Sequence, residues 1–175
     1  MNNNEILIRL RYALDIRDVD MIEIFKLGGI TVSREELRRL LLKPKNNNLI
    51  ESEDASFIAA DDMRKCNNYM LEAFLNGFIT FKRGKQEARS GEPEREAYII
   101  RDNKSVNNVM LKKLKIALSL TSEDMLSIFQ AAGVNLSNGE LSAVLRKEGQ
   151  RNYKECGDRY ARNFLKGLVI RYRER

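Results

Sequence analysis

An internal repeat limits this chain to folds that are built from two similar units. Residues 3–43 align with residues 107–147 at a constant offset of 104 without a gap, and 16 of the 41 aligned pairs are identical. A second block aligns at an offset of 90 and contains Cys66/Cys156, Phe74/Phe164, Leu75/Leu165 and Gly77/Gly167. The change of offset places about 14 additional residues in the first copy. The chain is therefore two copies of one unit.

Each copy has the periodicity of apolar residues that is typical of helices. Leu7, Leu10 and Leu14 recur at helical spacing, and so do the leucines at the aligned positions of the second copy. Asparagines stand near the start of this helix in both copies, and we expect them to cap free backbone N–H groups: Asn3, Asn4, Asn107 and Asn108. A second helix is predicted to start near Asp18 or Ser122, before a glycine suited to a left-handed helix end: Gly29 or Gly133.

Two further helices complete each unit. The third opens with Ser33-x-x-Glu36 or Ser137-x-x-Glu140, which is the capping-box pattern in both copies. The last covers roughly residues 66–82 or 156–172 and contains a glycine inside its helical pattern, where we expect another helix to cross closely. Because strand signals are nearly absent, the prediction is an all-α fold in which two tandem, homologous units of about four helices each pack together.

Domain boundaries follow from the repeat and from local composition. We place the first repeat at residues 1–82, with an insertion at about 44–62 and a short helix at 55–64. A linker rich in Lys, Glu, Arg and Gly is predicted at 83–104, and the second repeat at 105–175.

The absence of histidine bears on the classes of function that the chain can have. Without histidine, Ser-His-Asp catalysis, Cys-His catalysis, His-ligated zinc and haem are excluded.

Cys66 and Cys156 are too few and too far apart in sequence for a zinc site or a disulfide scaffold. The two cysteines lie at aligned positions of the repeats. One interpretation is that they form a redox or metal pair, but the better interpretation is that each is a buried packing residue. The carboxylates Asp20/Asp124 and Glu36/Glu140 are better explained as helix starts than as an acid–base set. We therefore expect no catalytic residue, metal or cofactor, and no enzyme.

Several motifs resemble the YehS-like family, which comprises small bacterial proteins built from a duplicated domain of unknown function. They are Asn107-Asn108-x-x-Leu111-Lys112-Lys113-Leu114-Lys115-Ile116-Ala117, Glu155-Cys156-Gly157-Asp158 with Phe164-Leu165-x-Gly167-Leu168, and Leu75-Asn76-Gly77 with Lys82-Arg83-Gly84-Lys85. The resemblance covers most of the chain but ends at 44–62, where the family has a short connection. It implies a bacterial protein of the cytoplasm without an established activity.

The charge is distributed unevenly between the two repeats. Residues 1–104 hold 18 basic and 18 acidic side chains, whereas residues 105–175 hold 13 basic and 7 acidic ones, so the net charge of +6 resides in the second repeat. Basic side chains that could contact nucleic-acid phosphates are Arg159, Arg162, Lys166, Arg171, Arg173, Lys112, Lys113 and Lys115. The leading hypothesis is therefore a non-enzymatic module that binds nucleic acid. The alternative is an adaptor whose groove between the repeats takes a partner helix, or a homodimer.

Two other features bear on partners. The second and third predicted helices have the outline of a helix-turn-helix, in which Arg34, Arg38 and Arg39 would be the better base readers, although the outline is common among helical hairpins. The N-terminus lacks a secretory pattern and no stretch approaches a membrane span. We therefore expect a cytoplasmic protein without a membrane partner.

Overall fold

The described residues, which are 1–43, 64–84 and 98–173 of a computed structural model, form eight helices and no strand. The first unit contains α1 (Asn3–Ala13), α2 (Asp18–Leu27), α3 (Arg34–Leu40) and α5 (Asn68–Arg83). The second contains α6 (Val106–Ala117), α7 (Ser122–Ala131), α8 (Asn138–Leu145) and α9 (Asp158–Tyr172). None of these helices is both long enough and apolar enough to span a membrane. The all-α prediction with two tandem units is confirmed.

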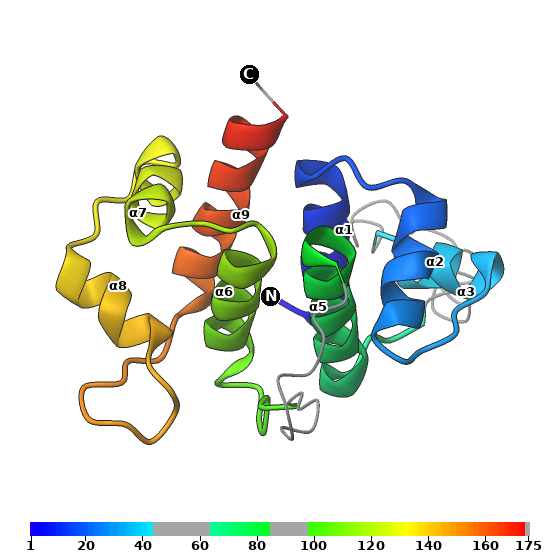
Figure 1. The fold of residues 1–175 in the computed structure, drawn as a ribbon, viewed down its shortest axis with the longest axis horizontal. Helices are drawn as coiled ribbons and strands as arrows, with labels where there is room; N and C mark the ends of the chain where they lie inside the picture. Colours follow the sequence, from blue (N-terminus) through cyan, green and yellow to red (C-terminus); the bar gives the residue numbers. More distant parts are fainter. Residues whose placement is uncertain (44–63, 85–97, 174–175) are drawn as a thin grey trace, which may run out of the picture.

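The first and last helices of each unit form the centre of the molecule (Figure 1). There α5 of the first unit packs on α6 of the second, and α9 of the second packs on α1 of the first. These two contacts are equivalent under the repeat, so the units face each other with approximate twofold symmetry. The remaining helices, α2 with α3 and α7 with α8, lie on the outside. One continuous apolar core runs through both units.

The four central helices run in the same direction, and arginines bind the ends of two of them. Arg83 at the end of α5 donates to the carbonyl of Ile116 at the end of α6 (3.2 Å). Arg173 after α9 donates in the same way to the carbonyl of Tyr12 at the end of α1 (2.9 Å). A cation at a helix C-terminus is favourable because the free carbonyls carry partial negative charge. The two arginines therefore join the repeats at equivalent positions.

The glycines predicted to lie at helix crossings do so. A Cβ atom built on Gly77 of α5 would lie 1.9 Å from the carbonyl oxygen of Ile24 in α2. A Cβ atom on Gly167 of α9 would lie 2.1 Å from the carbonyl oxygen of Ile128 in α7. Only glycine permits these backbones to approach so closely.

The capping predictions for Asn3, Asn4, Asn107 and Asn108 are wrong. Asn2 is the N-cap of α1 and Ser105 that of α6, so the four asparagines lie inside the helices. Asn4 and Asn108 are buried and bind other segments, because their positions face the end of the third helix and the start of the last. The Asn108 amide donates to the carbonyls of Val144 and Lys154 (2.9 and 2.8 Å), and its oxygen accepts from the Cys156 N–H (2.9 Å).

The remaining helix ends largely follow the sequence patterns. Gly29 and Gly133 adopt the predicted left-handed conformation, with φ of 93° and 88°. Ser137 and Glu140 form a complete capping box, whereas Ser33 accepts the Glu36 N–H without the reciprocal bond. Glu36 instead pairs with Arg64. The predicted insertion at 44–62, most of the helix at 55–64 and most of the linker at 83–104 lie outside the described residues.

Candidate functional site between α1 and α9

The prediction that Lys113 contacts nucleic acid is wrong, because this side chain is buried between the repeats. Its ammonium lies 3.1 Å from the Glu72 carboxylate, and the two side chains are only 8% and 1% exposed. Lys113 also contacts the side-chain oxygen of Asn76. The Glu72 carboxylate also accepts hydrogen bonds from the backbone N–H groups of Ile99 and Ile100 (2.7 and 2.8 Å). Lys113 therefore joins α6 to α5 and is inaccessible to a phosphate.

Three more of the predicted phosphate-binding residues pair with carboxylates of the chain itself. Arg171 lies 3.2 Å from Asp124, and Arg173 lies 3.3 Å from Asp15 while stacking on the Tyr12 ring at 4.1 Å. Arg162 lies 3.5 Å from Glu5 of the other repeat. Sequence spacing gave no indication of these partners, since all three lie more than 40 residues away in the chain.

The other four predicted residues are available on the surface. Arg159 and Lys166 are exposed on α9, and Lys112 and Lys115 are half-buried on α6. None of the four forms an ion pair with another residue in the described part of the chain. Burial, and secondarily the charge of Lys147, lowers the pKa of Lys112.

A groove of about 680 Å³ lies between α1 and α9. Much of its wall is formed by the ring of Tyr12 and by four apolar side chains, which are Ile8, Leu165, Val169 and Ile170. Among the described residues, one carboxylate lines the groove, that of Glu5, together with four cationic side chains: Arg9, Lys43, Arg162 and Lys166. Grooves of this size, apolar with a few convergent polar groups, are typical of ligand sites.

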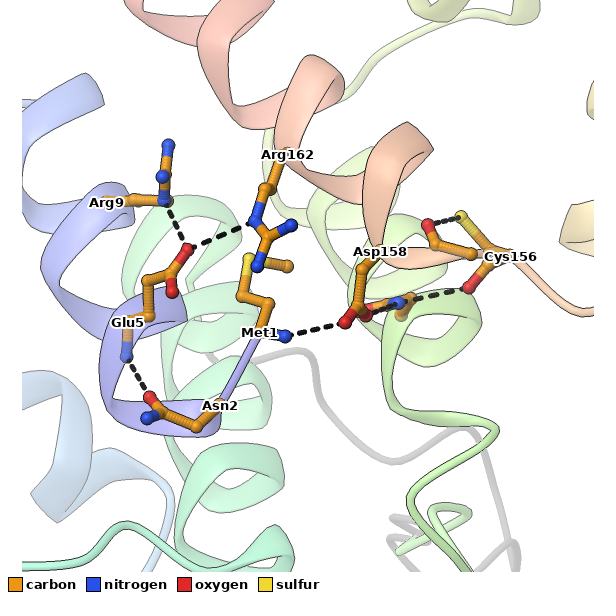
Figure 2. A network of polar contacts seen from close by, with 9 residues as sticks. Met1, Asn2, Glu5, Arg9, Cys156, Asp158 and Arg162 are labelled. Carbon is orange, nitrogen blue, oxygen red and sulfur yellow. Dashed lines mark hydrogen bonds and ion pairs between the residues drawn. The ribbon is translucent and has the colours of Figure 1, made fainter.

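Glu5 bridges two of the cations at one side of this groove (Figure 2). Its carboxylate oxygen lies 2.9 Å from Nε of Arg9 on the same helix and 3.5 Å from Nε of Arg162 on α9. Asn2 caps the same turn by accepting the Glu5 N–H (2.8 Å). One carboxylate is thus shared by two guanidinium groups from different repeats.

The equivalent interface between α5 and α6 has a different charge arrangement. The repeat aligns Glu72 with Arg162 and Lys113 with Arg9, so a buried anion–cation pair stands where the groove has two cations. It also aligns Val109 with Glu5. α5 and α6 pack more extensively than α1 and α9 do. The charge reversal between Glu72 and Arg162 is the sequence signal that could have located the groove.

A second cavity, of about 570 Å³, lies where the four central helices begin. Its walls are rich in asparagine amides that bond to one another, with Asn3 donating to Asn68 (2.8 Å) and Asn68 to Asn103 (3.0 Å). The α-amino group of Met1 lies 2.6 Å from Asp158 in this region, and that hydrogen bond lowers the pKa of the Asp158 carboxyl (Figure 2). The amides of Asn3 and Asn68 thus have partners within this cavity.

Cys66 and Cys156 are buried free thiols. Burial raises the pKa of each thiol to about 12, which makes the reactive thiolate rare at neutral pH. The described residues contain no group of three or more His, Cys, Asp or Glu side chains placed to hold a metal ion. The packing interpretation of the cysteines is confirmed by this burial.

Two of the arginines in the predicted helix-turn-helix form ion pairs within their own helix. Arg38 and Arg39 of α3 lie 2.8 and 3.4 Å from the carboxylate of Glu35 on the same helix. Asp124 lies in the first turn of α7 and forms a capping box with Thr121, and its hydrogen bonds with Thr121 lower the pKa of the Asp124 carboxyl. Asp124 and Glu140 thus serve helix starts, as expected.

Comparison with known proteins supports the duplication. A family model described as "Protein of unknown function (DUF1456)" matches residues 3–84 and, a second time, residues 107–174. The chain is 36% identical over 172 residues to "Uncharacterized protein YehS" of Escherichia coli (strain K12), which covers 98% of this chain and 96% of that protein. No solved structure matches the chain.

Proposed function

The chain belongs to the DUF1456 family, and we propose that it is a non-enzymatic binding module whose ligand site is the groove between α1 and α9. The resemblance to the YehS-like family is thereby confirmed, and the family itself has no described activity. The ligand would be partly apolar and negatively charged. A groove between the repeats was the alternative that the sequence left open.

The observation that supports this proposal is the charge of the groove. The described residues of its wall include three more cations than carboxylates, and these cations border apolar side chains. Cations beside low-dielectric walls attract an anion more strongly than cations in open water do. An anionic group with an apolar body would therefore gain from both parts of the wall.

The dye 8-anilinonaphthalene-1-sulfonate, which combines an apolar body with an anionic group, tests the proposal. We expect its fluorescence to rise on binding one site in the parent protein. Replacing half-buried Val169 with Trp fills the groove and should weaken dye binding by about tenfold or more. Val19→Trp places the same side chain at an exposed position outside the groove and is the matched control. Equal dye binding by the parent and V169W would contradict the proposal.

Binding to nucleic acid is the second candidate, supported by the four available cations. Arg159 and Lys166 are exposed on one face of α9, at positions that reach solvent together. Phosphate contacts give an affinity that falls steeply with salt, by a slope of about 0.9 for each phosphate neutralised. Contacts of this kind position the protein without reading bases.

A short DNA duplex, followed by fluorescence anisotropy over a series of salt concentrations, separates the two candidates. Arg159→Glu changes a cation outside the groove, so it should weaken DNA binding and reduce the salt slope without affecting the dye. Charge reversal at Arg159, Arg162 and Lys166 together should weaken DNA binding further. If the parent protein does not bind DNA, or if the triple variant binds it as the parent does, the nucleic-acid candidate is wrong and the groove remains the proposed site.

A further inference from the structure

The two equivalent interfaces between the repeats differ in what balances their charge. At the α5–α6 interface, Glu72 supplies a carboxylate that pairs with Lys113 at 3.1 Å. At the α1–α9 interface the aligned positions hold Arg162 and Arg9, and the carboxylate comes from a third position, Glu5. Within the described part of the chain, the first interface is therefore balanced by its own side chains, whereas the second has a surplus of positive charge.

The surplus is located next to the apolar part of the groove. Glu5 is already shared by Arg9 and Arg162, and neither Lys43 nor Lys166 pairs with a carboxylate of a described residue. Lys166 follows Arg162 by one helical turn, so both side chains extend from the same side of α9. A carboxylate suits this position because it accepts several charge-assisted hydrogen bonds and matches the planar guanidinium group. Glu5 contacts Nε of each arginine, so a ligand carboxylate lies beside Glu5, toward Lys166, and not in its place.

The apolar part of the groove has the dimensions of a short acyl chain. Arg162 and Ile170 are eight residues apart on α9, which corresponds to about 12 Å along the helix. Ile8 and Val169 face this length from opposite helices, and the ring of Tyr12, on which Arg173 stacks, lies at its far end. The volume of 680 Å³ falls within the range of roughly 300–1,000 Å³ that is usual for small-molecule sites.

We propose that the groove binds one anionic amphiphile of the medium-chain alkyl carboxylate class. The carboxylate lies among Arg9, Arg162 and Lys166, and the alkyl chain extends between Ile8 and Val169 toward Tyr12. This inference rests on the proposed function and adds the chemical class of the ligand. The positive surplus selects an anion over a neutral or cationic amphiphile of the same length.

Nuclear magnetic resonance titration of the full chain with octanoate, 1-octanol and octylammonium, each below its micelle concentration, tests the charge selection. Octanoate should bind one site about tenfold or more tightly than 1-octanol, and octylammonium should bind least. Lengthening the carboxylate from six to eight carbons should raise its affinity by about fourfold for each methylene group. The methyl resonances of Ile8, Val169 and Ile170 should shift first. Equal affinity for 1-octanol, or shifts confined to another surface, would overturn the proposal.

A variant that copies the α5–α6 charges into the groove provides the second test. The triple substitution E5V/R162E/K166N places the aligned residue types at all three positions and retains Arg9 as the cation. We expect it to lose octanoate binding by about tenfold or more while remaining folded. Arg159→Glu is the matched control, because it causes the same change in net charge from an exposed position outside the groove.

The outcomes separate this inference from the proposed function. If the naphthalene dye binds in the groove and octanoate does not, the ligand class is wrong and the groove remains the site. If an acidic amphipathic peptide binds there and octanoate does not, the occupant is a partner helix, and the proposal is likewise overturned. If the triple variant fails to fold, the methyl shifts and the octanol comparison in the parent still decide the result.

Discussion

Asn4 and Asn108 each join three segments of their unit through one amide side chain. The Asn4 amide donates to the carbonyls of Leu40 and Arg64 (3.0 and 2.6 Å), and its oxygen accepts from the Cys66 N–H (2.9 Å). These bonds repeat at Asn108 with the aligned partners. The buried asparagine therefore ties the end of the third helix and the start of the last to the first helix.

Asn4→Ala should lower the free energy of unfolding by about 2 kcal/mol or more, because it leaves a buried N–H group without its partner. Asn108→Ala should have a similar effect in the second unit. The control is Asn3→Ala, which removes one part-buried bond to Asn68 and should cost about 1 kcal/mol or less. Urea denaturation measures all three. Equal costs for Asn3→Ala and Asn4→Ala would contradict the assignment of this role.

The two buried thiols should make stability depend on alkaline pH. Their folded pKa of about 12 lies above the ordinary value of 9.0, so the unfolded state loses these protons first as the pH rises. Unfolding is then favoured, and the stability contribution that is present below pH 9 is lost between pH 9 and about 12.

Thermal melts of the parent and of the Cys66→Ala/Cys156→Ala variant at about pH 7 and about pH 10.5 measure this effect. The two pH values lie on either side of the ordinary thiol pKa of 9.0, which applies to the unfolded chain. The parent should lose more stability across this interval than the variant does. Thiol reagents should label both cysteines only as fast as the protein opens. Rapid labelling at neutral pH would show that the thiols are accessible and would refute their burial.

At the scale of helices, the crossings at Gly77 and Gly167 determine how the last helix of each unit packs on the second. Gly77→Ala or Gly167→Ala should be destabilising by roughly 1–3 kcal/mol or more, because the added Cβ atom would overlap a backbone carbonyl. Separating the helices to make room would weaken the packing of Phe74 on Phe25, whose ring centroids lie 5.0 Å apart.

Gly139→Ala is the matched control, since this glycine also lies in a helix but has an open environment. The nearest atom to its added Cβ would be the Ser137 hydroxyl at 3.9 Å. Alanine has the higher helix propensity, so this substitution should stabilise the protein by about 0.5–1 kcal/mol. Chemical denaturation should therefore show a lower free energy of unfolding for Gly77→Ala and Gly167→Ala and a higher one for Gly139→Ala. A loss of stability in Gly139→Ala would contradict this prediction.

At the scale of the whole molecule, the pair of Glu72 and Lys113 forms a buried charge contact between the repeats. Glu72→Ala leaves the Lys113 ammonium buried without its carboxylate, so we expect a cost of about 3–5 kcal/mol. Glu72→Met/Lys113→Met removes both charges and should cost less than the single substitution. Arg11→Ala, at an exposed ion pair with Asp18, is the control and should have little effect. A double variant less stable than Glu72→Ala would contradict this interpretation.

The sequence by itself determined the helical units, because helix formation depends on local patterns. The spacing of apolar residues, the glycines after α2 and α7 and the Ser–Glu pairs are all readable within a few residues of each other. The repeat added that the two units have the same fold. Even the close crossing at Gly77 followed, since glycine inside a helix is unfavourable unless another backbone lies against it.

Only the tertiary structure decided which cations are accessible and where a ligand could bind. Lys113 and Lys166 are both lysines on helical faces, and no local pattern indicates that the first pairs with Glu72 in the core while the second borders a groove. Asn4 has the local context of a cap and instead binds segments 36 and 60 residues away. Charge pairing, burial and cavities depend on which helix faces meet, and that is set by packing between residues far apart in the chain.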